Sequence, residues 1–166
     1  SVAGRIAALT LHEIDISAGA LLEPGRGVYI VPLMERLALP GDIAAATNPK
    51  SSTGRLDIFT RVITDGAREF DTIPAGYAGD LYLEISSRTF PIVVRAGSRL
   101  SQIRFRRGNA RRDDDALAAL NRTTPLTNEE PHIASGLTLS IDLSGDGGPV
   151  GYRAKRHTGL VDVDRR

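Results

Sequence analysis

The sequence predicts an all-β barrel or sandwich with one short connecting helix. Segments of strand-like composition recur along the chain, and glycine, proline or asparagine separates them. They are residues 27–33, 55–64, 80–86, 90–95, 99–105 and 137–143. The chain has 166 residues, 41% of them hydrophobic, which is enough to bury one core of its own.

One segment, residues 113–121, has helical character. It opens with three aspartates, and acidic side chains interact favourably with the positive end of a helix dipole. Leu117 and Leu120 follow three positions apart. We expect a connecting helix rather than a core helix.

Basic and acidic side chains nearly cancel, with 21 Lys and Arg against 20 Asp and Glu. No net field therefore draws the protein to nucleic acid or to an anionic membrane, and any anion site must be local. The arginine-rich run 104–112 is interpreted as a solvated face, because aromatic side chains that stack on bases are scarce. We predict neither a nucleic-acid partner nor a membrane partner.

The chain has no cysteine, which excludes disulfides, thiolate nucleophiles and zinc sites built on cysteine. This composition fits a reducing compartment, so we expect a cytoplasmic protein. Residues 1–20 do not have the charged and then apolar pattern of a secretory leader, and no apolar run is long enough to span a bilayer. We expect a soluble protein.

The most informative stretch is residues 48–55, where a turn-favouring Asn-Pro pair precedes small hydroxyl residues, a glycine and two cations. Small side chains let backbone N–H groups approach phosphate oxygens, and a guanidinium can bind two oxygens at once. The spacing is not that of a Walker A loop. On composition alone, an ordinary polar turn before a strand is the better interpretation. The candidate anion ligands are Lys50, Ser51, Ser52, Thr53, Gly54 and Arg55.

A glycine-flanked turn leads into residues 80–86. Strict alternation places Leu81, Leu83 and Ile85 on one face of this strand and Asp80, Tyr82 and Glu84 on the other. A carboxylate that is partly removed from water beside an arginine can exchange protons near neutral pH. The alternative is a surface glutamate paired with a nearby cation. Composition favours that alternative.

Other polar residues carry weaker signals. Gln102 lies in the strand 99–105, where an amide can recognise a pyrimidine edge or serve only the structure. His12, His132 and His157 have no metal-ligand spacing, so we interpret them as non-catalytic and predict no protein-bound metal. No nucleophile elbow is present.

Taken together, three stretches resemble the ordered motifs of the dCTP deaminase and trimeric dUTPase superfamily. They are Lys-Ser-Ser-Thr-Gly-Arg at 50–55, Gly-Tyr-Ala-Gly-Asp-Leu-Tyr-Leu-Glu at 76–84, and Ala-Gly followed by a strand at 96–105. The likeness covers residues 27–105 and is nearest to the long, two-unit bacterial deaminases. It implies a distorted jelly-roll or β-barrel fold and a homotrimer with active sites between subunits.

The resemblance also implies residue roles. Glu84 would be the general acid and base that activates water for attack at C4 of cytosine in dCTP. Ser51 and Arg55 would position the water, the exocyclic group and phosphate oxygens. The remaining loop residues would hold the triphosphate, and Tyr82 and Leu83 would line the base pocket through their backbone.

The implied reaction converts dCTP to dUTP and ammonia without zinc. Zinc nucleobase deaminases need cysteine ligands, which this chain lacks. Mg²⁺ would enter only with the triphosphate. Two alternatives remain: a dUTP diphosphatase, although Glu84 and the absence of a glycine-rich arm are not typical of one, and a catalytically silent nucleotide-binding module.

Some family features have no secure match. Asp71 and Arg68 are the candidates for the sugar or pyrimidine contact that precedes the Gly-Tyr turn, and Tyr152 and Lys155 are those that close over the triphosphate. The family's opening strand is not found, so we expect the chain to be a fragment. The predicted division is a deaminase domain at 1–122, a linker at 123–136, and the start of a second, incomplete unit at 137–166.

Overall fold

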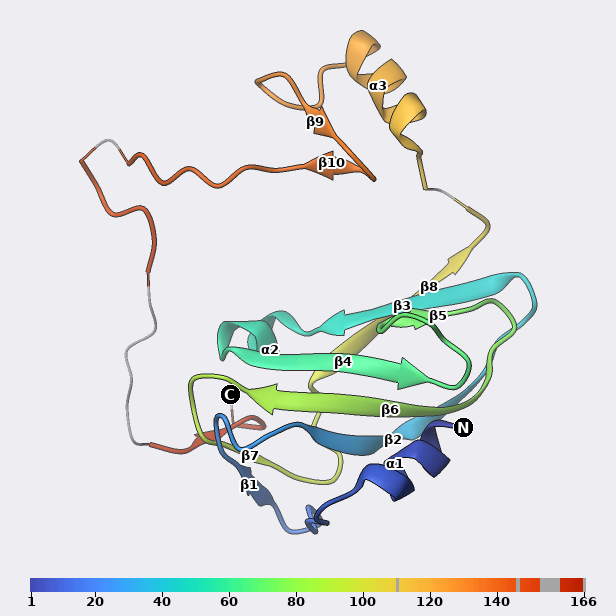
Figure 1. The fold of residues 1–166 in the computed structure, drawn as a ribbon, viewed down its shortest axis with the longest axis vertical. Coiled ribbons are helices and arrows are strands. Elements are labelled where there is room, and N and C mark those ends of the chain that lie inside the picture. Colours follow the sequence, from blue (N-terminus) through green and yellow to red (C-terminus); the bar gives the residue numbers. More distant parts are fainter. Residues whose placement is uncertain (110, 146, 153–158, 166) are drawn as a thin grey trace. The chain divides into compact units, whose positions relative to one another are not determined.

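The computed structural model describes residues 1–109, 111–145, 147–152 and 159–165 (Figure 1). Contacts divide the chain into two compact units, one of Ser1–Gly108 with Ala154–Arg166 and the other of Asn109–Arg153. The predicted ranges 1–122, 123–136 and 137–166 do not follow this division. They stay a prediction about the sequence units of the family.

The first unit is mostly β-structure. Its helices are α1 (Val2–Leu9) and α2 (Ser51–Arg55). Its strands are β1 (Ala20–Leu22), β2 (Tyr29–Ala38), β3 (Ile43–Pro49), β4 (Ile58–Thr64), β5 (Thr72–Ile73), β6 (Ala78–Ser87), β7 (Ile92–Val94), β8 (Ser101–Arg107) and β11 (Val161–Asp162). The predicted all-β class is therefore confirmed.

The strands of this unit form three small sheets with the orders β2-β6-β4, β5-β3-β8 and β1-β7-β11. All pairs are antiparallel except β11 with β7, which is parallel. In Figure 1, β6 lies between β2 and β4 as the central strand of its sheet. Residues 82–85 of β6 therefore have a cross-strand neighbour on each side.

One core joins the three sheets. The alternation predicted for β6 is confirmed, because Leu81, Leu83 and Ile85 are all at most 4% exposed. They pack with buried side chains from strands of the other sheets, among them Ala45 of β3 and Ile92 of β7. Close packing of apolar side chains from several sheets is what a β-sandwich core requires.

Strand β3 is the main departure from the predicted strands. Its sequence Ile-Ala-Ala-Ala-Thr-Asn-Pro has little β-propensity, yet Ala45 is fully buried. Asn48 and Pro49, which we predicted to form a turn, are the last residues of β3 and lie opposite Gln102 and Ser101 of β8. Pairing with β8 along its whole length outweighs the weak local preference, and proline is tolerated because it ends the strand.

The turn before β6 explains part of the glycine-rich motif. Gly76 has φ +73°, a conformation that favours glycine. The hydroxyl of Tyr77 donates to the carbonyl of Asp80 at 2.5 Å, and the backbone N–H of Asp65 donates to the same hydroxyl at 3.4 Å. Burial raises the pKa of Tyr77 above its ordinary value. The hydrogen bonds of the Tyr77 hydroxyl thus stabilise the turn and determine where β6 begins.

The second unit contains α3 (Asp114–Thr123), β9 (His132–Ile133) and β10 (Leu137–Thr138). The predicted helix is confirmed. Asp113 caps it by accepting from the N–H of Ala116, as expected for an acidic helix start. Helices α1 and α2 were not predicted, so the expectation of one helix was wrong.

The predicted strand 137–143 is also wrong in its length. Only Leu137 and Thr138 pair, with β9. Leu139, Ile141 and Leu143 are 77%, 84% and 70% exposed, and within the described part of the chain no strand pairs with them. Alternation alone does not make a strand, because backbone N–H and C=O groups need a partner strand.

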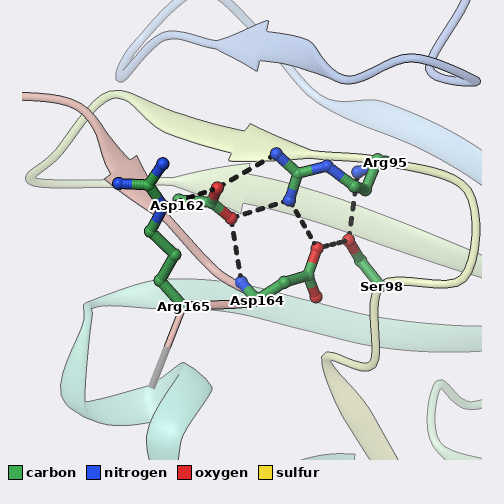
Figure 2. A network of polar contacts seen from close by, with 5 residues as sticks. All are labelled: Arg95, Ser98, Asp162, Asp164 and Arg165. Carbon is green, nitrogen blue, oxygen red and sulfur yellow. Dashed lines mark hydrogen bonds and ion pairs between the residues drawn. The ribbon is translucent and has the colours of Figure 1, made fainter.

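Within the first unit, a polar network connects strand β11 to the residues that follow β7 (Figure 2). The Arg95 guanidinium donates to both carboxylate oxygens of Asp162, at 2.7 and 3.0 Å, and to Asp164 at 2.8 Å. The hydroxyl of Ser98 donates to Asp164 at 2.7 Å. These contacts hold a strand that is distant in sequence against β7.

Candidate active site

Glu84 stands in the middle of the central strand β6, opposite Ile30 of β2 and Arg61 of β4. Its side chain is only 8% exposed. The Nη2 atom of Arg61 donates to Oε1 at 2.8 Å and to Oε2 at 2.9 Å. The positive charge of Arg61 thereby compensates the buried carboxylate, and the charge-assisted contact holds the carboxylate in place.

Arg61 is the functional candidate that sequence reasoning missed. Its guanidinium carbon lies 3.7 Å from the centroid of the Phe70 ring and 5.0 Å from that of Phe59, within the range of cation–π contacts. The Nε atom is buried, and no hydrogen-bond partner for it is found in the described part of the chain. Alternation along β4 places Phe59, Arg61 and Ile63 on one face, but only the register with β6 identifies Glu84 as the partner.

The predicted anion loop folds as the short helix α2 and its N-cap. The N–H of Lys50 donates to the carbonyl of Leu100 at 2.9 Å, and the buried Thr53 hydroxyl donates to the same carbonyl at 2.7 Å. Thr53 is 3% exposed and therefore anchors the loop. Four of the predicted residues are exposed: Ser51, Ser52, Gly54 and Arg55.

A pocket of about 530 Å³ lies where this loop meets β4. Gly54 of the loop, Phe59 of β4 and Arg88 are among its lining residues. Phe59 also contacts Arg61, so the pocket adjoins the aromatic surroundings of the Arg61–Glu84 pair. No hydrogen bond or ion pair joins Glu84 to Ser51 or Arg55 among the residues that the structure describes.

Asp71 has a structural position. Its Oδ1 accepts from the Thr47 hydroxyl at 2.7 Å and from the N–H of Val62 at 2.8 Å, and its own N–H donates to the carbonyl of Val62 at 2.9 Å. These contacts clamp the 65–71 loop between β3 and β4. Arg68, the other candidate for a sugar or pyrimidine contact, is exposed.

Tyr82 lies beside a break in the β2–β6 ladder. The register shifts between Pro32, which is opposite Tyr82, and Arg36, which is opposite Asp80. Proline has no N–H to donate to the ladder. Such irregularities are common next to active sites, where they interrupt pairing. The adjacent Leu83 is buried and regularly paired on both sides.

The remaining predicted residues are exposed or lie outside the described part of the chain. Gln102 is exposed on β8, opposite Asn48. Tyr152 is 95% exposed and belongs to the second unit, while Lys155 and His157 lie outside the described residues. His12 and His132 are exposed.

The described residues hold no group of three or more His, Cys, Asp or Glu side chains arranged to bind a metal ion. Within the same ranges, no helix is long and apolar enough to cross a membrane.

Family models match almost the whole chain. Residues 1–109 match the 2'-deoxycytidine 5'-triphosphate deaminase N-terminal domain, and residues 113–166 match the C-terminal domain of the same family.

Known proteins agree with this match. The chain is 36% identical over 96 residues to "dCTP deaminase, dUMP-forming" of Beutenbergia cavernae. The matched region covers 57% of this chain and 46% of the relative. It is 28% identical over 98 residues to the dCTP deaminase of Acidianus ambivalens, which covers 59% of this chain and 51% of the relative. The chain thus spans about half the length of the curated relatives it matches.

A solved structure extends the likeness to the fold. The crystal structure of 2'-deoxycytidine 5'-triphosphate deaminase from Agrobacterium tumefaciens is 60% identical and superposes with a TM-score of 0.75. The match covers 100% of this chain and 50% of that chain. A chain that carries both family domains, with a glutamate held at the centre of its sheet, belongs to the dCTP deaminase family.

Proposed function

We propose that the protein deaminates dCTP to dUTP and ammonia, with Glu84 as its general acid and base. The observation that carries this proposal is the buried carboxylate of Glu84. Glu84 lies on the central strand β6, and Arg61 of the neighbouring strand β4 holds its carboxylate in a chain that matches this family. A general base must be held within hydrogen-bond reach of the proton that it removes. A carboxylate fixed on a strand meets this requirement better than one on a mobile loop.

In the proposed reaction, Glu84 removes a proton from a water molecule as the water oxygen bonds to C4 of cytosine. Glu84 then returns this proton to the exocyclic nitrogen, the C4–N4 bond breaks, ammonia leaves, and the second proton of the attacking water moves to N3 of the ring. The base becomes uracil, and no electron transfer is involved. The gap in the ladder beside Tyr82 is a suitable place for a base edge to meet backbone groups.

The exposed Ser51, Ser52 and Arg55 are proposed to bind the triphosphate, which arrives with Mg²⁺ as part of the substrate. Lys50, Thr53 and Gly54 shape this loop. Since Glu84 has no contact with Ser51 or Arg55 in the described chain, we propose that the two halves of the site meet between subunits of a homotrimer. A trimer would also account for the exposed aromatic Phe105 of β8.

A second candidate follows from the names of two relatives at 36% and 38% identity, each called "dCTP deaminase, dUMP-forming". In that reaction a second water cleaves the bond between the α- and β-phosphates, which releases pyrophosphate and leaves dUMP. The same loop and glutamate are the candidates for both reactions.

We further propose that the protein acts in the cytoplasm. A nucleoside triphosphate carries several negative charges and does not cross a bilayer unaided, so the enzyme must share a compartment with its substrate.

The test is to incubate the full-length protein with Mg²⁺ and dCTP, and separately with dUTP, while ammonia, pyrophosphate and nucleotides are measured. Ammonia with dUTP supports simple deamination, and ammonia with pyrophosphate and dUMP supports the second candidate. Pyrophosphate from dUTP without deamination of dCTP would make the protein a dUTP diphosphatase. Nucleotide binding without any product would make it a silent binding module.

A further inference from the structure

We propose that Arg61 is a positioning residue, which fixes the orientation of the Glu84 carboxylate for catalysis. The inference rests on the proposed deaminase function. It goes beyond that function because it gives a role in positioning Glu84 to a residue outside the three sequence motifs. Arg61 lies on β4 in the segment between the loop 50–55 and the Gly-Tyr turn.

Arg61 and Glu84 are directly opposite in the β4–β6 ladder, so their Cβ atoms are held close by the backbone alone. A single nitrogen, Nη2, then reaches both carboxylate oxygens at nearly equal distances of 2.8 and 2.9 Å. Equal contacts to both oxygens fix the direction of the carboxylate more tightly than a contact to one oxygen.

Two phenylalanine rings hold the Arg61 side chain in place. Its guanidinium lies over the Phe70 ring at 3.7 Å and beside the Phe59 ring at 5.0 Å, which restricts the tilt of its plane. Phe70 is itself fixed, because the next residue, Asp71, is bonded to Val62 through both its side chain and its backbone. Phe70 therefore holds Arg61 in place, and Arg61 in turn holds Glu84.

The contact with Arg61 does not use all of the hydrogen-bonding capacity of the Glu84 carboxylate. An ionised carboxylate offers about four lone-pair sites, and Arg61 uses one on each oxygen. Each oxygen keeps a site for a water molecule or a substrate N–H. The pair thus fixes Glu84 without blocking it, and Arg61 acts through Glu84 rather than on the nucleotide.

A second pair in the same sheet shows the contrast. Arg36 and Asp80 face each other between β2 and β6, but Nε reaches a single oxygen at 2.6 Å, and the side chains are 74% and 55% exposed. That pair is a solvated surface contact. It contributes little to the stability of the fold and does not fix the orientation of the Asp80 carboxylate. It offers a matched control for the buried pair.

The experiment compares Arg61→Met with Arg36→Met in the full-length enzyme acting on dCTP. Arg61→Met keeps an apolar chain against Phe70 but removes the donors. We expect kcat to fall about 100-fold, as for a displaced catalytic group, while KM stays near the wild-type value. Arg36→Met should match the wild type in both constants. An unchanged kcat in folded Arg61→Met overturns the proposal, and so does a rise confined to KM.

Chemical rescue adds a readout that a merely structural role would not produce. In Arg61→Ala, added methylguanidinium should restore part of kcat, because the space beside Phe70 accepts a planar cation. Methylammonium, which lacks the planar group, should restore less. Equal rescue by both cations would overturn the claim that the guanidinium orients Glu84.

A crystal structure of Arg61→Met separates this inference from the proposed function. We expect the Glu84 carboxylate to leave its wild-type orientation or to adopt several, whether or not the protein deaminates dCTP. Retention of the wild-type orientation overturns the inference even if deamination is confirmed. A wild-type enzyme without deaminase activity would overturn the proposed function instead.

If Arg61→Met does not fold, Phe70→Leu replaces it. The Phe70 side chain is 44% exposed, so its loss leaves the core intact while it removes the ring that supports Arg61. We expect a smaller fall in kcat at unchanged KM. A kcat equal to that of the wild type would then overturn the proposal.

Discussion

The Tyr77 ring occupies the space in which a side chain on Gly79 would stand. A Cβ built on Gly79 would lie 2.8 Å from the Tyr77 hydroxyl oxygen and 3.1 Å from the ring carbon that bears it. The glycine of the Gly-Tyr-Ala-Gly motif is thus required by packing, whereas Gly76 is required by its positive φ. The motif sets the turn from which β6 carries Glu84.

Gly79→Ala is expected to destabilise the protein by about 1–3 kcal/mol, the usual cost of overpacking. Tyr77→Phe in the same chain removes the nearest atom and should recover part of this loss, which a double-mutant cycle in urea measures. Gly41→Ala is the control, because a Cβ there meets nothing within 4 Å. Additive effects of the two substitutions would contradict the packing explanation.

Glu84→Gln should lower kcat for dCTP about 100- to 10,000-fold, since an amide cannot exchange the proton, while nucleotide binding persists. Calorimetric titration with dCTP and an ammonia assay measure the two quantities. Glu13→Gln, an exposed glutamate in the same unit, is the control. Substantial deamination by Glu84→Gln would remove Glu84 from the mechanism.

Arg55→Lys should lower kcat/KM for dCTP about 10- to 100-fold, because a lysine gives up the two-point contact of a guanidinium with phosphate. Arg55 is exposed at the end of α2, so the melting temperature should not change. Arg106→Lys on the exposed part of β8 is the matched control. Wild-type kinetics in Arg55→Lys would argue against triphosphate binding by this loop.

Asp71→Ala is expected to cost about 2–3 kcal/mol of stability, because it leaves the Val62 N–H and the Thr47 hydroxyl without their acceptor. Its φ of 60° adds a penalty that asparagine tolerates better, so Asp71→Asn should be milder. Chemical denaturation measures both. If Asp71→Asn instead leaves stability intact and raises only KM, Asp71 contacts the nucleotide rather than the fold.

The Asp162 carboxylate makes the attachment of β11 sensitive to acid. The hydrogen bond from Arg95, and after it the one from the Asp164 N–H, lower the pKa of Asp162 from 3.8 to about 2. A carboxyl with a lowered folded-state pKa stabilises at pH above its ordinary value and loses this effect as the pH falls through the folded value. Attachment should therefore be constant above pH 3.8 and weaken toward pH 2.

Amide NMR signals of Val161 and Val163 report this directly, because their N–H groups donate to the carbonyls of Pro91 and Val93. Asp162→Asn should remove the acid transition. Asp142→Asn is the control, since its pKa is lowered only through Ser144 in the other unit. An unchanged transition in Asp162→Asn would show that another group controls β11.

Sequence alone determined those features that depend on neighbouring residues. Alternation in β6 identified the buried Leu81, Leu83 and Ile85, and the acidic run at 113–115 identified where α3 begins. The small, polar composition of the loop 50–55 predicted a polar turn, and four of its six residues are exposed. Periodicity and capping are local, so one stretch of sequence contains the whole signal.

Tertiary structure decided the partners. Glu84 is 23 positions from Arg61, and only the β4–β6 register makes them neighbours. The same holds for Asp71 with Thr47, for the alanine-rich β3, and for Asp162 with Arg95, 67 positions away. Residues 137–143 show the converse, because their alternation predicted a strand that lacks a paired neighbour beyond Thr138 among the described residues. Strand pairing is a relation between distant segments, and no single segment encodes its own partner.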